Sequence, residues 1–388
     1  MHLSYDVVEP STVGVDPGAV EALLERARRE VDDGLLPSCQ VAMAREGRLV
    51  AEEVYGEATS TSRYVVFSAT KGVVAGAIWL LVGNGELDVA QRVAEIVPEF
   101  GSNGKDRVTV EQLLTHTSGF PRAPMPRALW LDRAARLERF GRWRLNWDPG
   151  SQYEYHPTSA HWVLAEVIER ISGTDFRRFV HDRLLGPLGL RGPRLGVAEA
   201  DQGDVTTLVA VGEPATPEEL EAALGVSSID TGEVTEELLL GFNDARVREA
   251  GVPGAGGIAR ASDLALYYQA LLNNPRQLWN PAVLEDGTGR IRSRFPDPML
   301  GVPANRSLGL VVAGDDGQSH LRSNLGRTVS PRAFGHAGAG GQIAWADPAT
   351  GLSFAYVTNG LDANLLREAR RSTALSSRAA VCLTDEVA

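Results

Sequence analysis

Phe67-Ser68-Ala69-Thr70-Lys71-Gly72 precedes an apolar run from Val73 to Val82. The run predicts a helix, and if Ser68 opens that helix, the side chains of Ser68 and Lys71 lie on one face near its N-terminus. A serine hydroxyl needs a neighbouring base to act as a nucleophile, and a lysine amine becomes such a base when burial or nearby positive charge lowers its pKa. Taken alone, the short Ser-x-x-Lys motif is explained more simply by a helix-capping serine and a surface lysine, so the rest of the chain must decide.

Composition and charge limit the kinds of protein that this chain can be. It has 388 residues, 43% of them hydrophobic and 23% charged, which is typical of a globular protein with two or three structural units or one large domain with an insertion. The net charge of −12 argues against nucleic acid or an anionic membrane surface as a partner. No apolar run of about 18 residues is present, so we expect no transmembrane helix.

The cysteines and the first residues bear on cofactors and location. Cys39 and Cys382 lie at opposite ends of the chain and form neither a disulfide framework nor a zinc-binding pattern, so we expect no metal and no cofactor. Residues 1–6 carry neither a basic nor an apolar leader segment, which indicates a cytoplasmic protein. A chain from which a signal peptide has been removed would show the same pattern.

Strand and helix patterns repeat at the two ends of the chain. Two strand-like runs flank a turn near the N-terminus, residues 39–45 and 49–55, and a second such pair, 342–346 and 352–357, lies near the C-terminus. A helical pattern precedes the first pair and another follows the second. We therefore predict an α+β fold in which both ends build one antiparallel sheet flanked by helices, with an inserted all-helical domain.

This pattern also predicts the domain boundaries. Residues 1–66 and 305–388 should form the sheet domain, and residues 67–304 a mainly helical domain with variable insertions at about 198–240 and 285–304. The active site should lie in the cleft between the two domains, because binding sites commonly form there.

Two further motifs carry residues suited to catalysis. Tyr155 ends the turn-rich stretch 149–155 just before a predicted helix, where a tyrosine can relay a proton, although most such tyrosines are hydrogen-bonded core residues. The segment 334–341 (Phe-Gly-His-Ala-Gly-Ala-Gly-Gly) leads into a strand. Its small residues would let a substrate reach backbone N–H groups, although alone it is more typical of a glycine-rich turn.

The three motifs together resemble the serine β-lactamase and penicillin-binding-protein superfamily, and specifically its class C β-lactamase-like branch. That branch includes family VIII-like carboxylesterases and acyl-transferring relatives. Its pattern is Ser-x-x-Lys, then Tyr-x-Asn, then Lys/His-Thr/Ser-Gly, in the order and at about the spacing found here. Segments 113–119 and 253–264 match as well, so the resemblance covers most of the chain.

The resemblance implies a role for each matching residue. Ser68 would be the acylated nucleophile, Lys71 the base that activates it, and Tyr155 the group that passes a proton to the leaving group and later activates water. The backbone N–H groups of Ser68 and Ala339 would form the oxyanion hole. The residues expected to bind substrate or support the site are His336, Ala337, Gly338 and His156.

Two departures from the family pattern bear on the substrate. Pro157 replaces the asparagine of the second motif, so the amide that would hold an acyl-amide group is missing. Ala337 replaces the hydroxyl residue of the third motif, which would help hold a β-lactam carboxylate. A hydrogen bond to a charged group contributes about 1.5–3 kcal/mol, so both departures weaken the case for a β-lactamase or a peptidoglycan peptidase. Neither affects attack on an uncharged ester.

We therefore expect a cofactor-free serine hydrolase that works through an acyl-enzyme, with a small-molecule ester or amide as substrate. A carboxylesterase for small or medium acyl esters fits best. An acyltransferase, a β-lactamase and an amidase are the alternatives of the same fold. A non-catalytic binding protein is an alternative of another class. The oligomeric state is left open.

Overall fold

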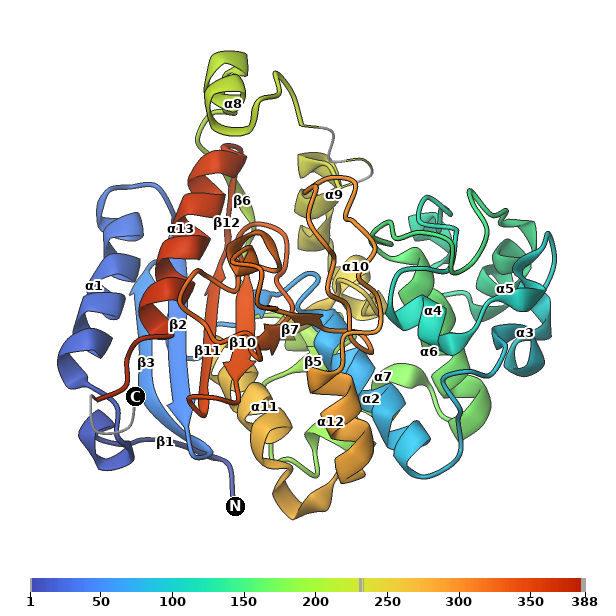
Figure 1. Ribbon diagram of the computed structural model, residues 1–388, viewed down its shortest axis with the longest axis horizontal. Helices are drawn as coiled ribbons and strands as arrows, with labels where there is room; N and C mark the ends of the chain where they lie inside the picture. The colour runs from blue at the N-terminus through green and yellow to red at the C-terminus, as the bar shows by residue number, and fades with distance from the viewer. Residues whose placement is uncertain (1, 230–231, 233, 385–388) are drawn as a thin grey trace.

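The computed structural model describes residues 2–229, 232 and 234–384, and its main sheet joins the two ends of the chain (Figure 1). The strand order is β1-β3-β2-β11-β10-β9-β8. The bounds are β1 Ser4–Val7, β2 Ser38–Arg45, β3 Arg48–Gly56, β8 Val311–Val312, β9 Phe334–Gly335, β10 Ile343–Asp347 and β11 Leu352–Thr358. In the centre, β2 from the N-terminal part pairs antiparallel with β11 from the C-terminal part, which confirms the predicted α+β fold.

One edge of this sheet differs from the prediction. β1 runs parallel to β3, whereas the other neighbours in the sheet are antiparallel. The hairpin between β2 and β3 turns at Glu46 and Gly47, both with positive φ (52° and 75°), the combination that tight hairpins require. β1 is not joined to β3 by such a turn, since α1 and β2 lie between them in the chain, and it is therefore free to pair in the parallel sense.

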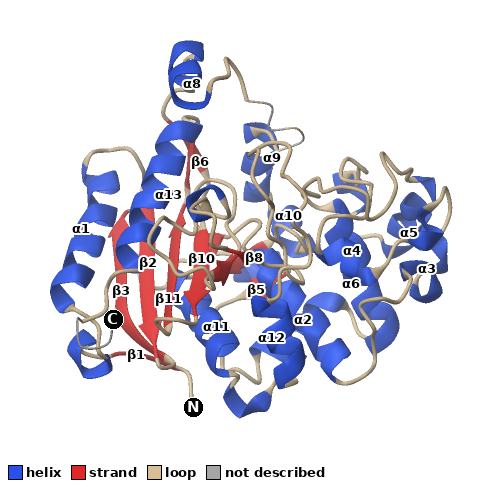
Figure 2. Ribbon diagram, viewed as in Figure 1, coloured by secondary structure: helices blue, strands red, loops and turns tan. Residues whose placement is uncertain are grey.

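Helices cover both faces of the sheet (Figure 2). Val41 and Met43 of β2 belong to the apolar cluster under α1 and α13, whereas Ala42 and Ala44 belong to the cluster that includes α11. Because successive side chains of a strand point to opposite faces and both faces are covered, β2 is apolar at four consecutive positions, 41–44. The helices are α1 Pro17–Asp32, α2 Thr70–Gly83, α3 Val93–Ile96, α4 Val110–Leu114, α5 Arg133–Arg142, α6 Ser159–Ser172, α7 Phe176–Phe179, α8 Pro217–Leu224, α9 Glu236–Leu240, α10 Ala245–Ala250, α11 Ala261–Asn273, α12 Pro281–Gly289 and α13 Leu365–Ala379.

The inserted part is not all-helical, which corrects the prediction. It contributes β5 (Arg194–Leu195) and β7 (Gly257–Ala259), which form a small sheet with β4 (Tyr64–Val65). The expected insertion at 198–240 contains β6 (Val209–Val211), which pairs in parallel with β12 (Gly360–Asp362) near the C-terminus. α11 falls within the range 67–304, yet it packs on the main sheet. The division into two domains stays a prediction.

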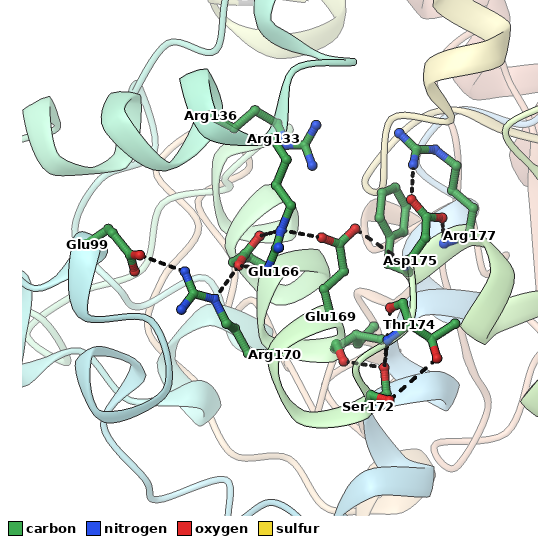
Figure 3. A network of polar contacts seen from close by, with 12 residues as sticks. Glu99, Arg133, Arg136, Glu166, Glu169, Arg170, Ser172, Thr174, Asp175 and Arg177 are labelled. Carbon is green, nitrogen blue, oxygen red and sulfur yellow. Dashed lines mark hydrogen bonds and ion pairs between the residues drawn. The ribbon is translucent and has the colours of Figure 1, made fainter.

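An ion-pair network fastens α5 to α6 in the helical part (Figure 3). Arg133 of α5 lies 2.6 Å from Glu166 and 2.8 Å from Glu169, two largely buried carboxylates one turn apart on α6. Arg170 bonds Glu166 and also Glu99, at 2.7 Å each. Burial raises the pKa of Glu169, whereas the hydrogen bond to Glu166 raises the pKa of Arg133. The network holds α5 and the segment around Glu99 on α6, a helix that begins four residues after Tyr155.

Across the described residues, none of the helices combines the length and the apolar character that crossing a membrane demands.

Candidate active site

Ser68 lies on a tight turn between β4 and α2. The helix begins at Thr70 rather than at Ser68, and its N-cap, Ala69, makes no side-chain capping bond, so the capping-serine interpretation does not hold. Phe67 has φ of 43°, an uncommon conformation for a bulky residue, and it is held by a bridge to Gly256. The Lys71 N–H donates to the Ser68 carbonyl at 3.0 Å, which keeps the two residues on one turn.

The Lys71 amine is fully buried and makes three polar contacts. Its Nζ lies 3.0 Å from Ser68 Oγ, 2.8 Å from the Pro157 carbonyl oxygen and 2.7 Å from that of Gly254. Burial, together with the charge of Arg306, lowers the pKa of Lys71 well below its usual value. A neutral amine keeps two N–H groups, one for each carbonyl, and its lone pair is left to accept the Ser68 hydroxyl proton.

The Tyr155 hydroxyl completes the contacts of Ser68 Oγ, to which it donates a hydrogen bond of 2.8 Å. Lys71 Nζ lies 4.9 Å from the centre of the Tyr155 ring. Burial raises the pKa of Tyr155, and Arg306 opposes that rise. Ser68 Oγ is therefore hydrogen-bonded to both Lys71 Nζ and the Tyr155 hydroxyl, and burial disfavours a charge on either partner. The structure brings together the three residues predicted to be catalytic.

The two N–H groups expected to form the oxyanion hole are both available. Among the described residues, neither the Ser68 N–H nor the Ala339 N–H donates a hydrogen bond. The turn carrying Ala339 lies against the nucleophile segment, since a Cβ built on Gly338 would lie 2.3 Å from the Val66 carbonyl oxygen. Gly338 is thus required by the close approach of two backbones. The oxyanion role of these groups stays a prediction.

His336 occupies the place of the basic residue in the third motif, but it is not a cation here. It is buried, its Nδ1 lies 2.8 Å from the Ala337 carbonyl oxygen, and its Nε2 lies 3.2 Å from Arg306 Nη1. Since the guanidinium can only donate, Nε2 accepts and Nδ1–H donates. Burial and then Arg306 lower the pKa of His336. Among the described residues its ring nitrogens make no bond to Tyr155; the ring centres are 6.1 Å apart.

His156 contacts residues that surround the site and does not line the cavity beside it. Its Nε2 accepts from the Phe120 N–H at 3.3 Å, and its Nδ1 lies 2.7 Å from the Glu154 carbonyl oxygen. Burial lowers its pKa to about 3, so the ring is neutral. His116, with φ of 58°, accepts the His156 N–H and places its ring 4.8 Å from that of Tyr155. In the part of the chain that the structure describes, no group of His, Cys, Asp or Glu is arranged to hold a metal ion.

A cavity of about 990 Å³ opens beside these residues. Tyr155, Pro157 and Ala339 line it. The residue proposed to relay protons, Tyr155, and the residue with the unbonded N–H group, Ala339, therefore border the same cavity. Residues before and after position 305 contribute apolar lining; examples are Pro121, Leu239, Met299, Leu361 and Leu365.

Arg306 is the residue of this site that sequence reasoning missed. Its side chain is buried, donates to the Tyr153 hydroxyl at 2.9 Å and lies 5.3 Å from the centre of the Tyr155 ring. The sequence offers a weak signal, a single arginine just before the apolar run 308–313, and a strand end at the surface looks the same. The carbonyls of Pro157 and Gly254 were missed as well, because backbone atoms leave no signature in a sequence.

The fold and the site define a class of protein, the serine β-lactamase and penicillin-binding-protein superfamily. The chain belongs to the Beta-lactamase family, whose family model matches residues 23–377. It is similar to the Esterase/beta-lactamase LipL of Mycobacterium tuberculosis, with 30% identity over 325 residues, 78% of this chain and 70% of that protein.

Solved structures show the same fold. A penicillin-binding protein homolog from Caulobacter crescentus superposes with a TM-score of 0.76 at 28% identity, over 95% of this chain and 99% of that one. A family VIII carboxylesterase also gives 0.76, at 24% identity, over 94% and 99%. The family, its named relatives and the common fold support a serine hydrolase.

Proposed function

We propose that the protein is a carboxylesterase that hydrolyses esters with small or medium acyl groups through an acyl-enzyme on Ser68. The observation that carries the proposal is the position of Ser68 Oγ, 3.0 Å from the buried Lys71 amine and 2.8 Å from the partly buried Tyr155 hydroxyl, beside a largely apolar cavity. The names of LipL and of the family VIII carboxylesterase point in the same direction. The absence of side-chain donors at Pro157 and Ala337 favours an uncharged ester over a β-lactam.

The proposed reaction has two halves. In the first, Ser68 Oγ attacks the ester carbonyl carbon as its proton moves to Lys71 Nζ, and the Ser68 and Ala339 N–H groups bind the oxyanion. Tyr155 then gives its proton to the leaving alkoxide and regains one from Lys71, so the alcohol departs. In the second half, water attacks the acyl carbon, its proton passes to the Tyr155–Lys71 pair, and Ser68 is released with its proton restored.

The test is hydrolysis of p-nitrophenyl acetate, butyrate and octanoate, with a chromogenic cephalosporin alongside and Ser68→Ala as the control. We expect ester turnover that Ser68→Ala lowers by several orders of magnitude, with little cephalosporin cleavage. Cephalosporin cleavage faster than ester cleavage would overturn the esterase assignment in favour of a β-lactamase. Ester turnover retained by Ser68→Ala would overturn the nucleophile.

A serine-reactive phosphonate gives a second readout that does not depend on the substrate. Mass spectrometry should place the label on Ser68 in the native protein. A protein that forms the adduct but turns over no ester would be an acyltransferase or an amidase. A protein that forms no adduct would be a binding protein that has kept the fold.

A further inference from the structure

Arg306 is held rigidly beside the three residues proposed to be catalytic. Its backbone pairs with Ser293 on one side and Val311 on the other. Its guanidinium reaches Tyr153 and His336 through hydrogen bonds of 2.9 and 3.2 Å. Only 6% of the residue is exposed. The charge therefore has a fixed place behind Tyr155.

This charge has no carboxylate partner. Among the described residues, no Asp or Glu oxygen lies within 4.0 Å of the Arg306 guanidinium, whereas the buried Arg322 and Arg371 each form ion pairs. Two carboxylates that line the same cavity are engaged elsewhere, Glu154 with Arg122 and Asp297 with backbone N–H groups. A buried charge without a counter-ion lowers stability, so its presence calls for a function.

The third motif lacks a positive charge of its own. His336 is neutral, because it is buried and its Nε2 accepts a bond from Arg306. A guanidinium remains protonated throughout the range in which proteins work. Arg306, thirty positions earlier in the chain, places its Nη1 3.2 Å from His336 Nε2 and so brings a permanent positive charge to the third motif.

We propose that Arg306 is the positioning residue that supplies the fixed positive charge of this site and tunes proton transfer between Ser68, Lys71 and Tyr155. Arg306 and Lys71 lie 5.3 and 4.9 Å from the centre of the same Tyr155 ring, so the charge of Arg306 disfavours a positive charge on Lys71 and keeps that amine free to accept the Ser68 proton. It also stabilises the negative charge that Tyr155 develops when it protonates the leaving group. Both effects serve the reaction proposed above, on which this inference rests.

The other ionisable groups around Lys71 do not supply this effect. Tyr155 is neutral, and the imidazoles that face Lys71 are buried with lowered pKa values, so they carry no charge at neutral pH. These imidazoles are His116 after α4, His156 before α6, His161 on α6 and His336 after β9. Among the described residues, no carboxylate forms an ion pair with Lys71. Arg306 is therefore the charge that an experiment should remove.

The experiment measures the second-order rate of Ser68 phosphonylation against pH for the native protein and for Arg306→Met and Arg306→Lys. The rate of the native protein should fall along an acid limb of this pH profile, where Lys71 gains a proton. In Arg306→Met this acid limb should move to higher pH by about one unit or more, so that the rate at pH values within the limb falls about tenfold and recovers on the alkaline side. Because Arg306→Lys keeps a positive charge, its acid limb should lie between those of the native protein and Arg306→Met. Arg122→Met should leave the limb in place, because Arg122 lines the same cavity but is 75% exposed.

Three outcomes would overturn the inference. One is an unchanged limb in folded Arg306→Met, with a uniform loss of rate at every pH, which is the mark of a purely structural residue. Another is loss confined to the KM for mono-p-nitrophenyl succinate, with p-nitrophenyl butyrate unaffected, because Arg306 would then bind an anionic substrate. The third is a native protein that the phosphonate does not label. Labelling without ester turnover would instead contradict the proposed function and leave the pH comparison valid.

Discussion

The Tyr155 hydroxyl donates a hydrogen bond of 2.8 Å to Ser68 Oγ, although 87 positions separate the two residues in the chain. Lys71 contacts the same oxygen from three positions away. One contact follows from a helical turn and the other from the fold, so the two respond differently to mutation.

Tyr155→Phe should lower ester turnover by about 10²- to 10⁴-fold, because it removes the group proposed to protonate the leaving alcohol. The ring stays, so thermal unfolding should change little. The matched control is Tyr64→Phe, since the Tyr64 hydroxyl is buried and is bonded at 3.0 Å to Ser38 rather than to Ser68. Equal activity in the two variants would contradict the role given to Tyr155.

Lys71→Met should change how stability depends on pH. The folded protein holds Lys71 with a lowered pKa, so between that pKa and the unfolded value near 10.5 the unfolded chain binds one more proton. As the pH increases through this range, the free energy of unfolding of the native protein should therefore rise relative to that of Lys71→Met, by up to about 1.4 kcal/mol per pH unit. Urea unfolding at pH 7, 8 and 9 measures the difference. A constant difference would mean that Lys71 stays protonated in the folded state.

Ala337→Thr should shift substrate preference toward β-lactams. The new hydroxyl restores a donor for a β-lactam carboxylate. A hydrogen bond to a charged group contributes about 1.5–3 kcal/mol, which corresponds to roughly a tenfold or larger increase in kcat/KM. The ratio of cephalosporin to p-nitrophenyl butyrate hydrolysis should rise by about that factor. Ala337→Val, which has the same shape but no hydroxyl, is the control and should not raise the ratio.

Gly338→Ala should lower turnover more than it lowers substrate affinity. A Cβ at this position would lie 2.3 Å from the Val66 carbonyl oxygen, so the turn that presents the Ala339 N–H has to move away from Ser68. Loss of one oxyanion donor typically lowers kcat by 10²- to 10³-fold. Gly203→Ala, where nothing lies within 4 Å of the added Cβ, should behave like the native protein. Native kcat in Gly338→Ala would exclude this turn from the oxyanion hole.

Arg133→Ala should destabilise the protein without changing its chemistry. It removes an ion-pair partner from the buried carboxylates of Glu166 and Glu169, while Arg170 still pairs with Glu166. Arg133 is about half exposed, so we expect a loss of roughly 1–2 kcal/mol in the free energy of unfolding. Denaturant unfolding and the kcat of the folded fraction test this. A changed kcat would mean that the network also positions the site.

The sequence by itself determined the features that depend on local spacing. Ser68 and Lys71 are neighbours in any helical turn, and the two strand pairs predicted the hairpins β2–β3 and β10–β11. The order of the three motifs added the family, the fold and the third residue of the cluster, Tyr155. Local rules failed where alternatives are close in energy, as at the helix start, which is Thr70 rather than Ser68.

Only the tertiary structure decided the electrostatics of the site. Burial lowers the pKa values of Lys71 and His336, and Arg306 reaches Tyr155 from a separate part of the chain. The carbonyls of Pro157 and Gly254 hold the Lys71 amine. The physical reason is that a pKa depends on desolvation and on charges close in space, whichever residues of the chain carry them. Spacing along the chain places the nucleophile and its base, and three-dimensional packing sets their charge.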